Sequence, residues 1–149
     1  MAQPKVPFGT KLRIKVFDGG GTPNFILLCG LTTKSFNQSK EMNDFTVPDC
    51  DDPEKIVAVQ RRARTKALEV SGAGVFNPAD RERLQEMFDD EEPRTLRIEL
   101  NVPLADGGGH WSGDFHLSQF NITGDDEGLM QADMTFLSHG EWDWTDAAS

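Results

Sequence analysis

The stretch 65–90 changes its hydrophobic period halfway along, and this change constrains the fold more than any other feature. Its first part alternates, with Leu68 and Val70 on one face, which is the period of a β-strand. In the second part, the apolar residues recur at the i, i+3, i+4 spacing of a helix. These residues are Leu84, Met87 and Phe88. The pattern predicts a strand that leads directly into one short helix.

The predicted helix spans about residues 77–90 and has a clear start. Asn77 can cap its free amides, Pro78 suits the first helical position, and Asp80 lies in the positive first turn. A helix of this length is marginal alone in water, so we expect it to lie on a sheet. Small residues precede it, and they indicate either a close approach of backbone or helix or a β-bulge. These are Gly72, Ala73 and Gly74.

Alternating segments on both sides of this unit predict further strands. They cover residues 11–17, 25–29, 31–39, 94–102, 111–117 and 130–136. The first two form a predicted hairpin around the turn 18–24, and the phase slips near Ser118, as at a bulge. We predict a mainly β fold, a β-sandwich or partly open barrel with one flanking helix and a long loop at 40–64.

A chain of 149 residues supports one domain of ordinary size. We place that domain at 11–140, after an extended arm at 1–10 that contains two prolines, and before a C-terminal tail at 141–149. No apolar run is long enough to span a bilayer, and the first residues contain no apolar signal-peptide core. We therefore expect no membrane anchor and synthesis in the cytoplasm.

The predicted loop at 40–64 lacks strong periodicity and has polarised charge. Its acidic residues come first and are Glu41, Asp44, Asp49, Asp51, Asp52 and Glu54. Its basic residues come last and are Arg61, Arg62 and Arg64. Loops of this length are usually functional or disordered. Three interpretations stay open: a solvated loop, a hard-cation site that lacks calcium-loop spacing, or a loop whose charges pair with a neighbouring subunit.

We find no catalytic or cofactor motif in the chain. The three histidines are scattered, and Asp114 and His116, which share a strand face, are better explained as polar residues on a wet surface. Cys29 and Cys50 form neither a zinc site nor a disulfide framework and are predicted to be free thiols. We expect no metal and no cofactor.

The net charge of −10 argues against nucleic-acid binding through an electropositive face. An acidic surface near DNA repels the phosphate backbone, although acidic composition also serves solubility alone. Trp142 and Trp144, which flank Asp143, form either an exposed recognition pair or an edge that covers the core, and we favour packing. Trp111 belongs to one face of the predicted strand at 111–117.

The order of these features resembles the tail tube proteins of long-tailed, non-contractile bacteriophages and of gene transfer agents. The resemblance covers roughly 12–140. It rests on residues 30–33 leading into 35–37, on the strand ending at 70–76 with the helix directly after it, and on the closing strand at 128–140.

The resemblance implies a β-sandwich with a flanking helix, assembled as hexameric rings that stack into a hollow tube. It implies no enzyme activity and no cofactor. Its partners would be copies of itself, a tape-measure protein, and the tail terminator and distal tail proteins. DNA would pass through the lumen without specific binding, and the long loop and terminal arms would join one ring to the next.

The resemblance places the protein in the virion tail, assembled in the host cytoplasm. For the lumen wall we select the polar strand faces with Glu99, Asp114, Gln131 and Asp133. Two alternatives stay open. One is the tube protein of a contractile tail or secretion machine. The other is a β-sandwich module that binds a ligand on its tryptophans.

Overall fold

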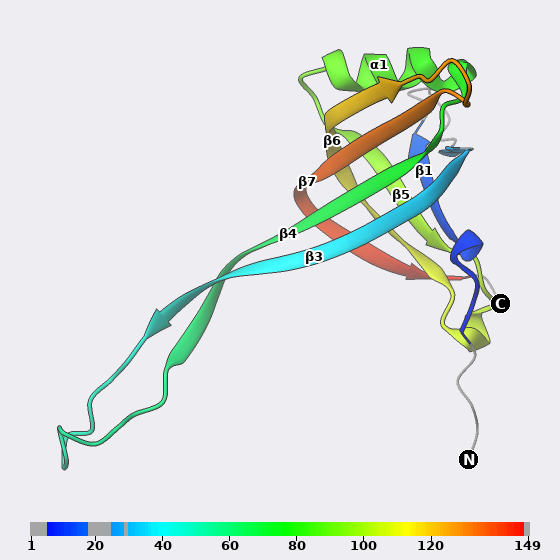
Figure 1. Ribbon diagram of the computed structural model, residues 1–149. Helices are drawn as coiled ribbons and strands as arrows, with labels where there is room; N and C mark the ends of the chain where they lie inside the picture. The colour runs from blue at the N-terminus through cyan, green and yellow to red at the C-terminus, as the bar shows by residue number, and fades with distance from the viewer. Residues whose placement is uncertain (1–5, 18–24, 29, 148–149) are drawn as a thin grey trace.

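The computed structural model describes residues 6–17, 25–28 and 30–147 of the chain. Within them the fold consists of one α-helix, three short 3₁₀ helices and seven strands (Figure 1). The strands are β1 (Leu12–Phe17), β2 (Phe25–Leu27), β3 (Leu31–Phe45), β4 (Gln60–Val75), β5 (Arg94–Leu100), β6 (Gly109–Thr123) and β7 (Gln131–Asp146). The helix is α1 (Arg81–Asp89), and the 3₁₀ helices are η1 (Gly9–Lys11), η2 (Pro78–Asp80) and η3 (Leu104–Asp106). Three parts of the sequence prediction lie outside the described residues: the turn at 18–24, Cys29, and residues 1–5 of the N-terminal extended segment.

All seven strands form one antiparallel sheet in the order β2-β1-β5-β6-β7-β4-β3. The strands β2 and β3 occupy its opposite edges, although only residues 28–30 separate them along the chain. The sheet must therefore roll so that its two edges approach each other. Among the described residues no ladder joins β2 to β3, so the roll stays open. This confirms the predicted mainly β fold, in its partly open form.

The core fills the inside of the roll. It consists of Ile14, Val16, Leu28, Leu68, Val70, Phe76, Leu84, Met87, Leu96, Ile98, Phe115, Leu117, Ala132, Met134 and Phe136. Phe36 on β3 stacks on Trp111 of β6 with ring centroids 4.3 Å apart. Trp144 meets Trp111 edge-on at 4.6 Å, and Trp142 packs against the core. The predicted packing is therefore confirmed for Trp142, whereas Trp144 contacts Trp111 but is 38% exposed.

The helix lies over one end of the roll (Figure 1). Asn77 caps the 3₁₀ helix η2, which leads directly into α1, because its side-chain oxygen accepts a hydrogen bond from the Ala79 amide at 3.1 Å. The α-helix itself begins at Arg81. Leu84 and Met87 are buried, which confirms the helical stripe. Phe88 was expected beside them but is 46% exposed. The nine-residue helix is thus anchored by two side chains rather than three.

The small residues before the helix allow a close backbone approach. A Cβ added to Gly74 would lie 2.2 Å from the carbonyl oxygen of Gly30. The register of β3 against β4 also shifts between Leu31 and Thr33, opposite this point. The close backbone approach is therefore observed at Gly74 on β4, and the irregularity in pairing lies opposite it, on β3.

The predicted loop at 40–64 is wrong over much of its length. β3 continues to Phe45 and β4 begins at Gln60, so the connecting loop covers only 46–59. The two strands pair along this extension, with a register shift between Glu41 and Met42. Both faces of the extension are exposed. A ribbon with two wet faces shows no apolar–polar alternation, and this is why the pattern was missed.

The last two strands are longer than expected. β7 continues to Asp146, and residues 142–146 pair with β6, although they were predicted as part of a tail. The predicted phase slip in β6 is confirmed as a register shift between Leu117 and Gln119. A second shift lies between Gly113 and Asp114.

We predict that Gly74→Ala lowers the free energy of unfolding by about 1–3 kcal/mol, because the new methyl group meets backbone that cannot yield freely. Urea denaturation at a concentration where the protein is monomeric measures this effect. Gly124→Ala is the matched control, since nothing lies within 4 Å of a Cβ there. Equal stability of the two variants would contradict the close packing at Gly74.

Candidate assembly surfaces

A two-stranded arm projects from the rolled sheet (Figure 1). We define the arm as residues 38–67. β7 pairs with β4 only between Glu69 and Val75, so the first part of β4 pairs with β3 alone. Among the described residues, the arm therefore has no third strand and no core beneath it. An isolated two-stranded ribbon is at best marginally stable in water, so the arm requires a further surface to pack on.

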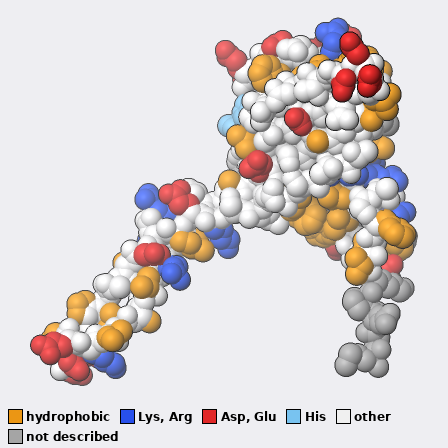
Figure 2. Space-filling model, viewed as in Figure 1, with side chains coloured by type: hydrophobic (Ala, Val, Ile, Leu, Met, Phe, Trp, Pro, Cys, Tyr) orange, Lys and Arg blue, Asp and Glu red, His pale blue; other side chains and the backbone are white. Residues whose placement is uncertain are grey.

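Several apolar side chains of the arm face solvent. They are Met42, Phe45, Val47, Ile56 and Val59. Ile56, in the loop, is 95% exposed. A series of exposed apolar residues on a projecting ribbon is typical of a contact surface. Figure 2 shows these side chains interspersed with charged ones along the arm.

The nine charged residues predicted as a stacking loop all lie in the arm, but in different parts of it. Glu41 and Asp44 lie on β3, the three arginines lie on β4, and the other four carboxylates lie in the loop. Arg61 pairs with Asp44 at 3.1 Å within the arm. Part of the polarised charge is therefore satisfied inside one subunit. Asp49 accepts a hydrogen bond from the Asp51 amide at 2.9 Å and so helps to shape the loop.

The outward face of the sheet over β3, β4, β7 and the end of β6 is polar. Its side chains alternate with the buried core residues, and the strand register lines them up in rows. They are Thr33, Ser35, Asn37, Glu69, Ser71, Ala73, Asp114, His116, Gln119, Asn121, Thr123, Gln131, Asp133, Thr135, Leu137 and His139. Among these described positions there is no lysine and no arginine. We call this surface the cation-free face.

Three of the four residues predicted for a lumen wall lie on the cation-free face, and the fourth lies on another region of the same outward sheet face. The three are Asp114, Gln131 and Asp133. Glu99 lies on β5, where its carboxylate pairs with Lys15 at 2.8 Å. This neighbourhood is basic, and burial together with nearby Arg97 lowers the pKa of His110 there.

The cation-free face is bounded on both sides by a strand edge without a ladder partner among the described residues: β3 on one side and the end of β6 on the other. β3 pairs only with β4, along its whole length. β5 pairs with β6 only as far as Phe115, so the rest of β6 pairs with β7 alone. Unpaired backbone groups along a strand are a template for pairing with another chain.

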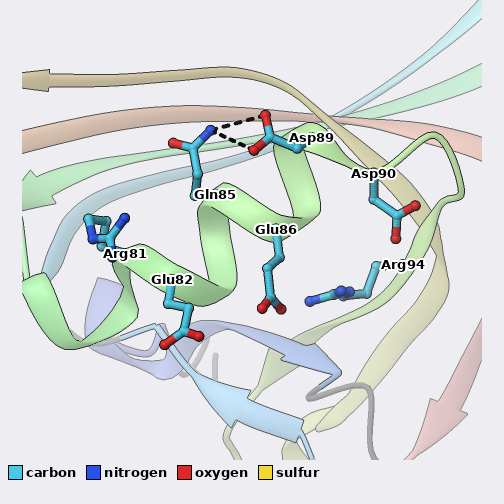
Figure 3. Close-up of a pocket in the computed structure, with 7 residues that line it drawn as sticks. All are labelled: Arg81, Glu82, Gln85, Glu86, Asp89, Asp90 and Arg94. Atoms are coloured by element: carbon cyan, nitrogen blue, oxygen red, sulfur yellow. Dashed lines mark hydrogen bonds between the residues drawn. The ribbon is translucent and has the colours of Figure 1, made fainter.

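A groove on the outer side of α1 is a site that our sequence interpretation missed. Its lining residues are Arg81, Glu82, Gln85, Glu86, Asp89, Asp90 and Arg94 (Figure 3). Gln85 donates hydrogen bonds to both oxygens of Asp89, at 3.1 and 3.2 Å. Glu86 and Arg94 point toward each other across the groove. The run of carboxylates between residues 80 and 92 was a sign of this acidic surface, but only Asp80 entered the prediction, as a residue of the first helical turn.

The isolated titratable residues have separate partners. Asp114 accepts a hydrogen bond from Thr95 at 2.9 Å, whereas His116 contacts the ring of His139. Cys50 is a free, exposed thiol in the arm. Within the described residues, no group of three or more His, Cys, Asp or Glu side chains is arranged to hold a metal ion. None of the helices in the described part of the chain is long and apolar enough to cross a membrane.

Comparison with solved structures shows the same fold in assembled tails. The chain superimposes on the tail subunit of a gene transfer agent particle refined with C6 symmetry (TM-score 0.74, 22% identity, 94% of this chain and 99% of that one). The SPP1 tail tube gives a TM-score of 0.71 at 10% identity, covering 95% and 80%. A chain of the anti-feeding prophage baseplate gives 0.64 at 11% identity, covering 98% of each.

No curated protein sequence matches the chain. A family model described as phage tail tube protein matches residues 8–143, nearly the whole chain. This match agrees with the projecting arm, the open strand edges and the structural similarity above. The chain belongs to the phage tail tube protein family and is a structural subunit of the virion tail.

Proposed function

We propose that this protein assembles into hexameric rings that stack into a tube, and that DNA passes through the lumen during ejection. The arm is the observation that carries the proposal, because no other element in the described part of the chain pairs with it. The resemblance to tail tube proteins supplies the ring number. This role requires no catalytic step and no cofactor.

The open strand edges support ring formation. β3 lies at one side of the cation-free face and the end of β6 at the other. A contact between β3 of one copy and β6 of the next is head-to-tail, and it closes into a ring when the rotation per copy is right. Repetition around the ring then pairs every strand edge and continues the sheet as a closed wall.

The arm supports stacking of the rings. It projects beyond the body of its own subunit, so its apolar and charged residues reach a different layer of copies (Figure 1). Such a contact repeats without closing on itself and produces an open filament. The predicted stacking residues of the arm therefore contact the neighbouring ring in our proposal. Their charges give the contact its register.

The cation-free face supports a lumen that does not retain DNA. Duplex DNA carries about one negative charge per 1.7 Å of its axis, and proteins grip it mainly with lysine and arginine. A wall with Asp114, Gln131 and Asp133 offers hydroxyls, amides and carboxylates instead. Electrostatic effects reach about 8 Å at physiological salt, so the residues nearest the DNA matter most. We assign Glu99 to another region of the outward sheet face because it pairs with Lys15.

The remaining partners follow from the proposed role. A tape-measure protein would fill the lumen before ejection, and tail terminator and distal tail proteins would cap the tube. Assembly would take place in the host cytoplasm. The similarity to a chain of an extracellular contractile injection system leaves a contractile tube as the second candidate, and a sheath gene beside this one would favour it.

We predict that the purified protein forms tubes in negative-stain electron micrographs and that shortening the arm prevents their growth. Replacement of residues 41–65 by Asn-Gly closes the strands at the Lys40–Lys66 pair with a two-residue turn. This variant should keep a β-sheet circular dichroism spectrum, reduced only by the strand residues that are removed, but form rings or single subunits only. Tubes of normal length would contradict the stacking role of the arm.

We predict that Asp133→Lys makes the tubes bind DNA. Six new ammonium groups per ring would face the phosphates, so binding should weaken steeply as salt increases. Retention of labelled duplex DNA by sedimented tubes measures this effect. Asp133→Asn is the matched control, since it removes a negative charge without adding a positive one. Equal retention by both variants would place Asp133 outside the lumen.

A further inference from the structure

The end of the body that carries α1 is strongly acidic. We define this α1 end as residues 80–94 together with the turn at 124–130. It contains ten aspartates and glutamates against three arginines and no lysine. Figure 2 shows acidic side chains gathered over this end. It also exposes apolar side chains, namely Phe88, Leu129 and Met130.

The paired strands of the arm have the opposite character. They carry five basic residues, Lys40, Arg61, Arg62, Arg64 and Lys66, against two carboxylates, Glu41 and Asp44. Arg62 and Arg64 line a hollow in the ribbon next to Asn43. The exposed apolar residues Met42 and Phe45 lie on the same ribbon. The ribbon is therefore basic and apolar, whereas the α1 end is acidic and apolar.

The two surfaces lie at opposite ends of one strand. β4 begins in the arm at Gln60 and ends at Val75, and the helical segment starts at Pro78. Its sixteen residues span about 50 Å at the rise of an extended strand. The arm and α1 accordingly lie at opposite ends of the molecule (Figure 1). In rings stacked with one orientation, the arm of each copy points toward the α1 end of the next ring.

We infer that the groove on α1 is the seat for the basic ribbon of an arm from the adjacent ring. The inference rests on the proposed stacking function and names the surface that receives the arm. Arg62 and Arg64 would face Glu86 and Asp90, whose carboxylates line the groove. Exposed ion pairs contribute little individually. The contact repeats in every copy around the ring, so weak pairs add up to a stable junction.

A charge-swap experiment tests this inference in the full-length protein. The arm variant is Arg62→Glu with Arg64→Glu, and the groove variant is Glu86→Arg with Asp90→Arg. Each alone should raise the protein concentration for half-maximal tube formation at least tenfold, measured by sedimentation, while rings still form. The protein that carries all four changes should form tubes again within about threefold of the wild-type concentration, because the charges are exchanged and complementary.

The control is Lys11→Glu with Arg13→Glu, which reverses two basic charges on and beside β1, outside both surfaces. It should stack as the wild type does. Failure of the four-fold variant to recover, or an equal loss in the control, would overturn the pairing of these surfaces. Wild-type protein that never forms tubes would instead overturn the proposed function itself, so the two failures are distinguishable.

Discussion

The structure depends on β4 serving two environments within one continuous strand. Its second half is part of the rolled sheet, where Leu68 and Val70 are fully buried and β7 pairs along the other side. Its first half leaves the body with β3 as its only neighbour. Because the strand does not break between the halves, the buried half fixes the direction of the exposed one. The packing of β4 in the core thus determines the direction in which the arm projects.

The parts that are unfavourable in a lone subunit are the ones that favour assembly. Open strand edges, a ribbon without a core and exposed apolar side chains all leave free energy to be gained on contact with another copy. The net charge of −10 opposes association between unassembled subunits at long range. At contact distance, the local distribution of charge is what matters, and it differs sharply between the arm and the α1 end.

Strands with one face in the core could be predicted from the sequence, whereas the part of β3 and β4 that has no buried face could not. Alternation located the buried faces of β1, β5 and β7, and the residue types around Asn77 located the helix start. The continuation of β3 and β4 into the arm gave no such signal, because neither face of that ribbon is buried. Arg61 opposite Asp44 was a usable sign of strand pairing. The three interpretations considered for the charged loop did not include pairing within the subunit.

The lumen wall stays a prediction, but the structure separates Glu99 from the other three residues predicted for it. Glu99 and Asp133 both alternate with core residues, so the sequence places both on an outward face. It does not show that the outward face divides into a basic region near β1 and a cation-free region over β7, which depends on the strand order. The α1 groove likewise requires the position of Arg94, which comes from the next strand, beside the helix.

The continuity of β4 also determines how the protein responds to mechanical load. A pull along the arm runs parallel to the β3–β4 and β4–β7 ladders, so the hydrogen bonds between these strands are loaded in shear and all at once. Separation by unzipping would break them one at a time at much lower force. In the stacked tube that we propose, the load would pass from ring to ring along these ladders. The strength of each junction would then depend on how the next ring holds the tip of the arm, rather than on the subunit that extends it.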